Sequence, residues 1–200
     1  MLLYNVVALR FLHIIPMPFT APQSIESSRT RLRIVEASDL PALLRVNGDD
    51  EVTRYLPYAT WLSQADAQAW YERIVKAQGS GTALQFAVIE KASDQVIGTC
   101  LLFRYDEGSQ RAELGYVLGR QYWGTGLMLD ALQALLGHAF HVMHLRRVEA
   151  EVNPANTASV HLLERLGFTR EGLQRQRWVD KGQAYDVAVF GLLRDEYPCA

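Results

Sequence analysis

Cysteine is scarce in this chain, which has only Cys100 and Cys199 among its 200 residues. One lies inside an apolar stretch and the other at the tail, so the two are too few for a disulfide framework. No cysteine and histidine stand at the spacing of zinc ligands either. We therefore expect no metal site, and a reducing, cytoplasmic compartment.

The chain also lacks an excess of charge of one sign. Its 20 lysines and arginines stand against 22 aspartates and glutamates, for a net charge of −2. No basic run is long enough to follow a phosphate backbone, so we expect no nucleic-acid partner. Hydrophobic residues make up 49% of the chain, which is enough to bury the core of a folded domain.

No segment has the full pattern of a targeting signal. The first 16 residues, MLLYNVVALRFLHIIP, are apolar, but no positive residue precedes them and no small-residue cleavage site follows. They are also too short to span a bilayer. We expect an accessory tail, with Met17 as one candidate for the native start, no membrane partner, and targeting as the alternative. We divide the chain into an N-terminal extension of uncertain role, residues 1–28, and one domain, residues 29–196.

Hydrophobic periodicity predicts an α+β fold. Strands are expected at 31–37, 84–90, 95–105, 111–119, 146–152, 168–179 and 184–193. Helices are expected at 40–47, capped by Asp39, at 64–77, opened by Ser63, at 126–143, with an apolar face from Met128 to Val142, and at 155–167. The order implies a central mixed, mostly antiparallel sheet of about seven strands flanked by four helices. Its parallel crossover runs through the 126–143 helix.

Two glycines fall where that helix begins, in the sequence Gln-Tyr-Trp-Gly-Thr-Gly at 121–126. The first N–H groups of a helix lack partners, and the helix dipole favours an anion there. Because Gly124 and Gly126 carry no side chain, a phosphate can approach these amides directly. Leu127 stands where a Walker loop needs lysine, and Gly119 is too far upstream for the dinucleotide fingerprint. On its own, the G-x-G turn also fits a tight turn without a ligand.

The loop pattern Q-x-x-G-x-G resembles the acyl-CoA pyrophosphate loop of the GNAT superfamily of N-acetyltransferases. The segments AELGYVLGRQYWGTGLMLDALQALLGHAF, RRVEAEVNPANTASVHLLERLGFTREG and DVAVFGLLRDEY resemble its branch of ribosomal-protein-alanine (RimJ/RimL-like) acetyltransferases, and the likeness covers about residues 29–196. The resemblance implies a GNAT fold. It also implies acetyl-CoA as cosubstrate and direct acetyl transfer to an amine, without a covalent enzyme intermediate.

The same resemblance implies which residues contact the cofactor. Two strands splay apart in this fold, and the backbone of Tyr116, Val117 and Leu118 would pair with the pantetheine arm in the gap, with an N–H near Leu118 on the thioester oxygen. Asn156 would contact the pantetheine as well. The pyrophosphate would rest on the amides of the loop, namely Gln121, Tyr122, Trp123, Gly124, Thr125, Gly126 and Leu127.

Acetylating an amine requires a neutral nucleophile and a proton for the departing thiolate. Glu113, just before the cofactor stretch, is the candidate general base, acting directly or through water; an ion-paired or solvent-facing glutamate is the alternative. Ser159 shares a helical face with Asn156, and the resemblance makes it the candidate proton donor. Its alternative is a serine bonded to a carbonyl one turn earlier. Glu149 and Glu151 are expected at the outer face or the acceptor mouth.

We expect the acceptor to be a primary amine at a protein or peptide N-terminus. A small-molecule amine (an amino acid, a polyamine or an antibiotic) is the alternative within enzymes, and a catalytically silent acyl-CoA-binding domain is the alternative from another class. The acidic and aromatic segment 48–61, together with Tyr185 and Asp186, would form the acceptor side. The closing hairpin would suit a homodimer.

Overall fold

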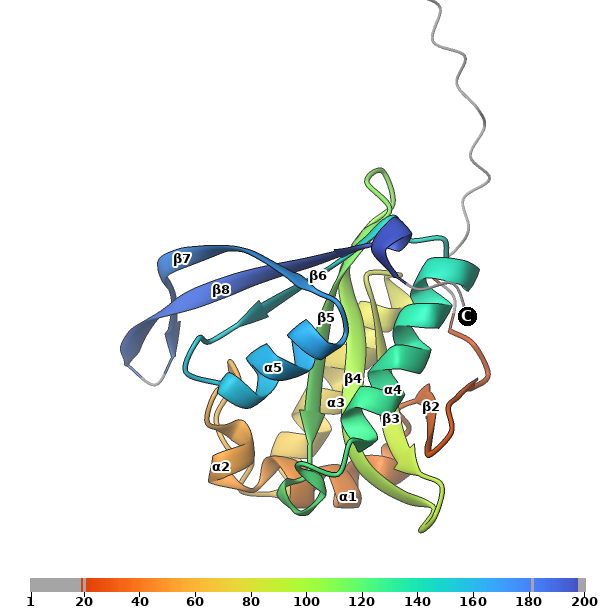
Figure 1. The fold of residues 1–200 in the computed structure, drawn as a ribbon. Helices are drawn as coiled ribbons and strands as arrows, with labels where there is room; N and C mark the ends of the chain where they lie inside the picture. Colours follow the sequence, from red (N-terminus) through yellow and green to blue (C-terminus); the bar gives the residue numbers. More distant parts are fainter. Residues whose placement is uncertain (1–18, 20, 181, 198–200) are drawn as a thin grey trace, which may run out of the picture.

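The computed structural model describes residue 19, residues 21–180 and residues 182–197. Within these residues an eight-stranded sheet forms in the order β1-β2-β3-β4-β5-β6-β8-β7, with helices on both faces (Figure 1). Neighbouring strands are antiparallel except β5 and β6, which are parallel and joined through α4. The expected α+β class and the mixed sheet with its parallel crossover are confirmed.

The strands of the sheet are β1 (Ile25–Glu26), β2 (Thr30–Ile34), β3 (Ala83–Glu90), β4 (Gln95–Asp106), β5 (Arg111–Leu118), β6 (Arg147–Val152), β7 (Thr169–Asp180) and β8 (Gln183–Leu193). All seven expected strands are present. The eighth, β1, has two residues and pairs with β2, so it is too short to show a period of two. It lies in the segment assigned to the extension.

The helices are α1 (Leu40–Asn47), α2 (Asp50–Thr53), α3 (Gln64–Gly79), α4 (Leu127–Gly137) and α5 (Thr157–Arg165), with 3-10 turns η1 (Ala37–Asp39), η2 (Arg120–Tyr122) and η4 (Arg194–Glu196) and a π-helical turn η3 (His138–Val142). The four expected helices are present. The fifth, α2, lies in the segment expected to be a connection, because four residues carry no helical period.

One local prediction is confirmed in part and another is wrong. Asp39 is the N-cap residue of α1, but its side chain makes no capping hydrogen bond, because its carboxylate binds the Arg33 guanidinium at 2.7 Å and the Glu36 N–H at 2.8 Å. Val142 does not continue the apolar face of α4 and is 52% exposed. The helix widens into a π-helical turn from His138, and a wider turn breaks the 3.6-residue period on which that prediction rested.

Hydrophobic side chains fill both sides of the sheet. The larger cluster, which includes Phe86, Leu132 and Phe140, lies between the sheet and helices α4 and α5. A smaller cluster around Leu43 and Trp61 lies under α1 and α3 on the opposite face (Figure 1). In the part of the chain described, no helix is long and apolar enough to cross a membrane.

The centre of the sheet opens because strands β5 and β6 splay apart. They are paired only over Arg111–Glu113 and Arg147–Glu149, and beyond these residues the two strands diverge (Figure 1). The Gly119 N–H donates to the Ile97 carbonyl at 2.8 Å. Polar backbone groups alternate along a strand, so those of Tyr116 and Leu118 point away from β4 and into the gap. This is the splayed geometry that the resemblance implied.

Candidate active site

The glycine loop between β5 and α4 turns twice through the left-handed region. Gly124 has φ +73° and Gly126 has φ +81°, a conformation in which a Cβ clashes with the following carbonyl. Next to Gly124, an added Cβ would meet no atom within 4 Å. Glycine is therefore favoured at position 124 by the backbone conformation and not by crowding from neighbouring atoms.

Only part of the loop offers amides to a ligand. The N–H groups of Tyr122, Trp123 and Thr125 close turns onto carbonyls of the loop itself. The N–H groups of Gly124 and Gly126 have no hydrogen-bond partner among the described residues. The amides of Met128 and Leu129 in the first turn of α4 are open too, because the first helical bond runs from Asp130 back to Gly126, whereas the Leu127 N–H donates to the Thr125 Oγ1 at 3.5 Å. Met128 and Leu129, which the sequence did not suggest, thus join the anion-facing set.

Hydrogen bonds from residues 27–30, about 100 positions earlier in the sequence, brace the loop. Asp130, in the first turn of α4, accepts hydrogen bonds from the hydroxyls of Ser27, Ser28 and Thr30 and from the Arg29 N–H. The Arg29 guanidinium donates to the Thr125 carbonyl at 2.8 Å. Four consecutive residues before and within β2 therefore fix both the helix start and the loop.

A cavity of about 460 Å³ lies between this loop, the gap in the sheet and α5; we call it the loop cavity. Of the residues expected to hold the cofactor, it is lined by Tyr116, Val117, Leu118, Tyr122, Trp123, Gly124, Gly126 and Asn156. Gln121, Thr125 and Leu127 lie outside the lining. The Leu127 side chain is buried in the core, and the Thr125 hydroxyl donates a hydrogen bond to the Tyr122 carbonyl.

One backbone group expected to receive the pantetheine already has a partner. The Trp123 indole N–H donates to the Leu118 carbonyl at 2.8 Å, while 47% of Trp123 is exposed. The indole therefore lies against the outer end of the gap. The Leu118 N–H and the backbone groups of Tyr116 still face the gap.

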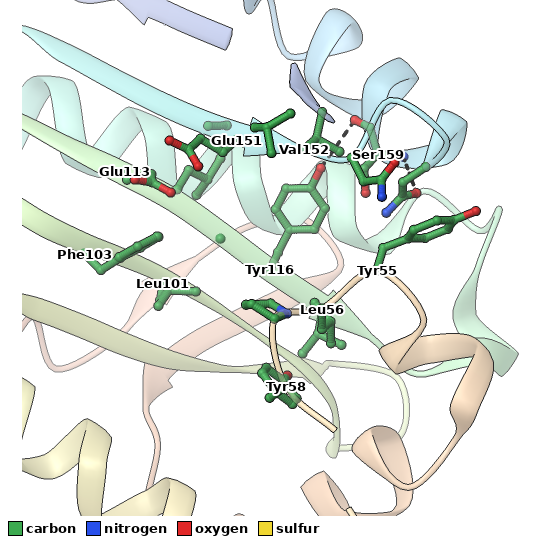
Figure 2. A pocket seen from close by; sticks show the side chains of 18 of the residues that line it. Tyr55, Leu56, Tyr58, Leu101, Phe103, Glu113, Tyr116, Glu151, Val152 and Ser159 are labelled. Atoms are coloured by element: carbon green, nitrogen blue, oxygen red, sulfur yellow. Dashed lines mark hydrogen bonds between the residues drawn. The ribbon is translucent and has the colours of Figure 1, made fainter. Parts of the chain in front are cut away.

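A second cavity, of about 360 Å³, continues from the first along the face of the sheet that carries α1 and α3; we call it the strand cavity. Tyr116, Val117, Asn156 and Ser159 line both cavities, so the two adjoin at these side chains. Figure 2 shows Glu113 and Glu151 together at one end and Tyr116 reaching toward Ser159. Glu113 lines only the strand cavity.

Glu113 is neither solvent-facing nor alone. Its side chain is 12% exposed, and its carboxylate lies 2.6 Å from the Arg104 guanidinium. Burial raises the pKa of Glu113 above its usual value, and the hydrogen bond and charge of Arg104 oppose that rise only in part. A carboxylate with a raised pKa is a stronger base than an exposed one, as general-base chemistry requires.

Asn156 and Ser159 meet at the start of α5. Asn156 is its N-cap, and its Oδ1 accepts the Ser159 N–H at 3.2 Å. The Asn156 Nδ2 and the Ser159 Oγ have no hydrogen-bond partner among the described residues, so the bond from Ser159 to a carbonyl one turn earlier is not seen. The Tyr116 hydroxyl donates to the Ser159 carbonyl at 3.4 Å, and burial raises the pKa of Tyr116 to about 12. Two hydroxyls that can donate a proton thus lie at the junction of the cavities.

The other two acidic candidates, Glu149 and Glu151, lie in different surroundings. Glu151 lines the strand cavity and accepts the Trp178 indole N–H at 2.9 Å. Glu149 lines neither cavity and forms ion pairs with Arg111 and Arg147, both at 2.8 Å. Within the residues described, no group of three histidine, cysteine or acidic side chains could hold a metal ion.

Comparison with known proteins decides the family. The pattern of the family "Acetyltransferase (GNAT) domain" matches residues 29–169. The chain is a GNAT acetyltransferase. The N-acetyltransferase p20 of Bacillus licheniformis is 38% identical to it over 175 residues, 88% of this chain and 98% of that protein.

One further relative of this GNAT acetyltransferase and one solved structure with the same fold are named for different substrates. The [ribosomal protein uS5]-alanine N-acetyltransferase of Escherichia coli is 31% identical over 118 residues, 58% of this chain and 61% of that protein. The spermidine N-acetyltransferase of Vibrio cholerae, solved with CoA and spermine, has the same fold, with a TM-score of 0.75 at 23% identity; the match covers 85% of this chain and 98% of that one. Acetyl-CoA-dependent N-acetyl transfer is thus the family's chemistry, and these names leave the acceptor class open.

Proposed function

We propose that this GNAT enzyme transfers the acetyl group of acetyl-CoA directly to the amine at a protein or peptide N-terminus. The observation that carries the proposal is the meeting of two cavities at Tyr116 and Ser159, with Glu113 in one of them and the glycine loop at the other. A thioester entering from the loop and an amine entering from the strand side would meet at that junction.

The loop cavity suits an acyl-CoA. The amides of Gly124, Gly126, Met128 and Leu129 would receive the pyrophosphate, because they face the helix start without partners. The backbone of Tyr116 and the Leu118 N–H would pair with the pantetheine arm as a neighbouring strand would. The contact we expect from Asn156 falls to its Nδ2, since its Oδ1 caps α5.

The strand cavity supplies the acid–base groups. Glu113 accepts a proton from the acceptor ammonium, directly or through a water, and the freed amine attacks the thioester carbonyl carbon. The Leu118 N–H stabilises the oxyanion that forms. When the carbon–sulfur bond breaks, Ser159 gives its proton to the thiolate, and the second proton of the attacking nitrogen passes to the Ser159 oxygen, so that an amide, a free thiol and the serine hydroxyl result. The Tyr116 hydroxyl is the competing donor. Cys100, the cysteine among the described residues, takes no part, since it is buried in the core and lines neither cavity.

An N-terminal amine is favoured over a small amine by the relative that acetylates the alanine of ribosomal protein uS5. The strand cavity is also flanked by Tyr55 and by Trp178 and Tyr185 of the closing hairpin, which would hold a peptide beyond its first residue. A small-molecule amine is the second candidate, and the Vibrio cholerae spermidine enzyme shows only that the fold accommodates one. We place the enzyme in the cytoplasm, the compartment of ribosomes and acetyl-CoA.

The proposal is tested by free-thiol release from acetyl-CoA with two acceptor sets, N-terminal alanine and serine peptides on one side, and amino acids, polyamines and aminoglycosides on the other. We expect release with a peptide set at rates well above background hydrolysis. A peptide with an acetyl-blocked N-terminus and an internal lysine is the matched control and should stay inactive. Release confined to the small amines would reject the N-terminal acceptor.

A further inference from the structure

Arg104 occupies an unusual place in β4. Phe103 pairs with Glu113 and Asp106 with Arg111, so β4 carries one more residue than β5 over this stretch, which is a β-bulge. Arg104 has φ +50°, the left-handed conformation that one class of bulge adopts, usually at a glycine. In a regular strand, consecutive side chains face opposite sides. The bulge instead lets both Phe103 and Arg104 line the strand cavity.

The Arg104 guanidinium lies where an acceptor ammonium would have to come. Its Nη1 is 2.6 Å from Glu113 and 4.0 Å from Glu151. Its centre lies 5.5 Å from the Phe103 ring and 5.8 Å from the Trp178 ring. Aromatic faces and carboxylates together are the surroundings that hold an organic cation. Arg104 thus provides a cation of its own beside the candidate base.

Arg104 also sets the charge of the strand cavity. Among the described residues that line it, the charged ones are Arg104, Glu113 and Glu151, which leaves one net negative charge. Besides these, the charge that acts on Glu113 is that of Glu149 from β6, which forms ion pairs with Arg111 and Arg147. The cavity can therefore balance one positive charge on an acceptor, and a second one would meet the guanidinium.

We propose that Arg104 makes the enzyme select acceptors that carry one positive charge, the reacting ammonium, and reject amines with a second cation close to it. The inference deepens the proposed function and rests on it. A peptide N-terminus followed by uncharged residues satisfies the rule, whereas a polyamine does not. Arg104 is a specificity-determining residue and takes no proton itself.

The test compares acceptors of matched shape that differ by one charge. One pair is alanyl-norleucine amide and alanyl-lysine amide; the other is hexylamine and 1,6-diaminohexane. We expect kcat/KM to favour the singly charged member by roughly tenfold, since like charges a few ångströms apart repel strongly in a partly buried site. In Arg104→Gln this preference should disappear or reverse, and Arg104→Lys should retain it.

Arg177→Gln is the control, because Arg177 stacks on the same Trp178 ring at 5.5 Å but does not line the strand cavity. Its acceptor ratio should match the parent enzyme. The acid limb of the pH profile gives a second readout: Arg104→Gln should move it to higher pH, since the Glu113 carboxylate then loses its cation, and Arg104→Lys should not.

The outcomes separate this inference from the proposed function. Turnover of both members of a pair with the same ratio in Arg104→Gln as in the parent enzyme overturns the inference alone. A parent enzyme that prefers the doubly charged member overturns it too. Release from the hexylamine pair without release from the peptides rejects the N-terminal acceptor and still decides the role of Arg104. Turnover of neither pair rejects both.

Discussion

The two adjoining cavities differ in net charge and in the kind of group that lines them. The charged residues lining the loop cavity are Arg54 and Arg165 against Glu51, so it is net positive, as suits a cofactor with phosphates. The strand cavity is net negative, as suits an ammonium. The loop cavity presents backbone amides and carbonyls to its ligand, whereas the strand cavity presents side chains. Substitutions should therefore affect the first through conformation and the second through chemistry.

The largest effect is expected from Gly124→Glu. It puts a side chain at φ +73° and a carboxylate beside the anion-facing amides, so acetyl-CoA affinity should fall by about 100-fold or more. Isothermal titration calorimetry with acetyl-CoA measures this loss. Gly124→Asn is the control, because asparagine tolerates the left-handed region, and it should lose far less. Unchanged affinity in a folded Gly124→Glu protein would remove the loop from the cofactor site.

Removing the candidate base should affect the other cavity only. In Glu113→Gln, kcat/KM should fall by about 100-fold, while acetyl-CoA affinity stays the same because Glu113 lies outside the loop cavity. In the parent enzyme the rate should rise with pH as Glu113 loses its proton, at a pH above the usual carboxyl range because burial raises its pKa.

The control for that variant is Glu149→Gln, which removes a carboxylate at the position paired with Glu113 in the sheet but outside both cavities. Its rate should stay near that of the parent enzyme and its acid limb should persist, moved at most slightly to lower pH because the Glu149 charge helps to raise the pKa of Glu113. If Glu113→Gln also keeps that limb and its rate, another group accepts the proton.

The junction of the cavities offers two proton donors that kinetics can separate. Ser159→Ala should lower kcat by about 10-fold to 100-fold with little change in KM for acetyl-CoA, whereas Tyr116→Phe should have the smaller effect. The Tyr116 hydroxyl is tied to the Ser159 carbonyl, and that of Ser159 is free among the described residues. Pre-steady-state thiol release gives both values. The reverse order would assign the proton to Tyr116.

Asp130→Ala is expected to have the smallest effect on catalysis. It should, however, lower the stability of the protein. The variant removes the acceptor of the Ser28 hydroxyl and the Arg29 N–H and one of the partners of the Ser27 and Thr30 hydroxyls, so the free energy of unfolding should drop by about 1–3 kcal/mol. Urea denaturation measures it, with Asp195→Ala as control because that side chain is 94% exposed. Equal midpoints for the two variants would contradict the brace.

The same carboxylate should give a pH signature. Burial acts to raise the pKa of Asp130, but the hydrogen bonds from Ser27, Ser28, Arg29 and Thr30 outweigh it and lower the pKa below the usual value. Its contribution to stability is therefore complete above the unfolded pKa and lost as the pH falls through the folded one. The stability difference between Asp130→Ala and the parent protein should narrow in acid.

The sequence alone predicted most of the loop cavity and only part of the strand cavity. Glu113, Glu151, Tyr185 and part of segment 48–61 line the strand cavity as expected for the acceptor side, but Arg104 was not predicted there. The anion-binding role of Gly124 and Gly126 could be predicted because glycines at a helix start form a local sequence pattern. The strands of the sheet could be predicted from hydrophobic periodicity. The place of Arg104 could not be predicted, because a one-residue bulge reverses which side a side chain faces and leaves no mark in the pattern. Asp130 was missed for a similar reason, since its partners lie about 100 positions earlier. The roles of Glu113, Ser159 and Asn156, the domain boundaries and the homodimer stay predictions.

The junction of the two cavities at Tyr116 and Ser159 is central to the proposed reaction, and a crystal structure of the enzyme with CoA tests its role most directly. We expect the pyrophosphate on the amides of Gly124, Gly126 and the first turn of α4, the pantetheine between β5 and β6, and the sulfur beside the Ser159 and Tyr116 hydroxyls. A CoA molecule bound with its sulfur away from this junction, or with its pyrophosphate off the glycine loop, would contradict it.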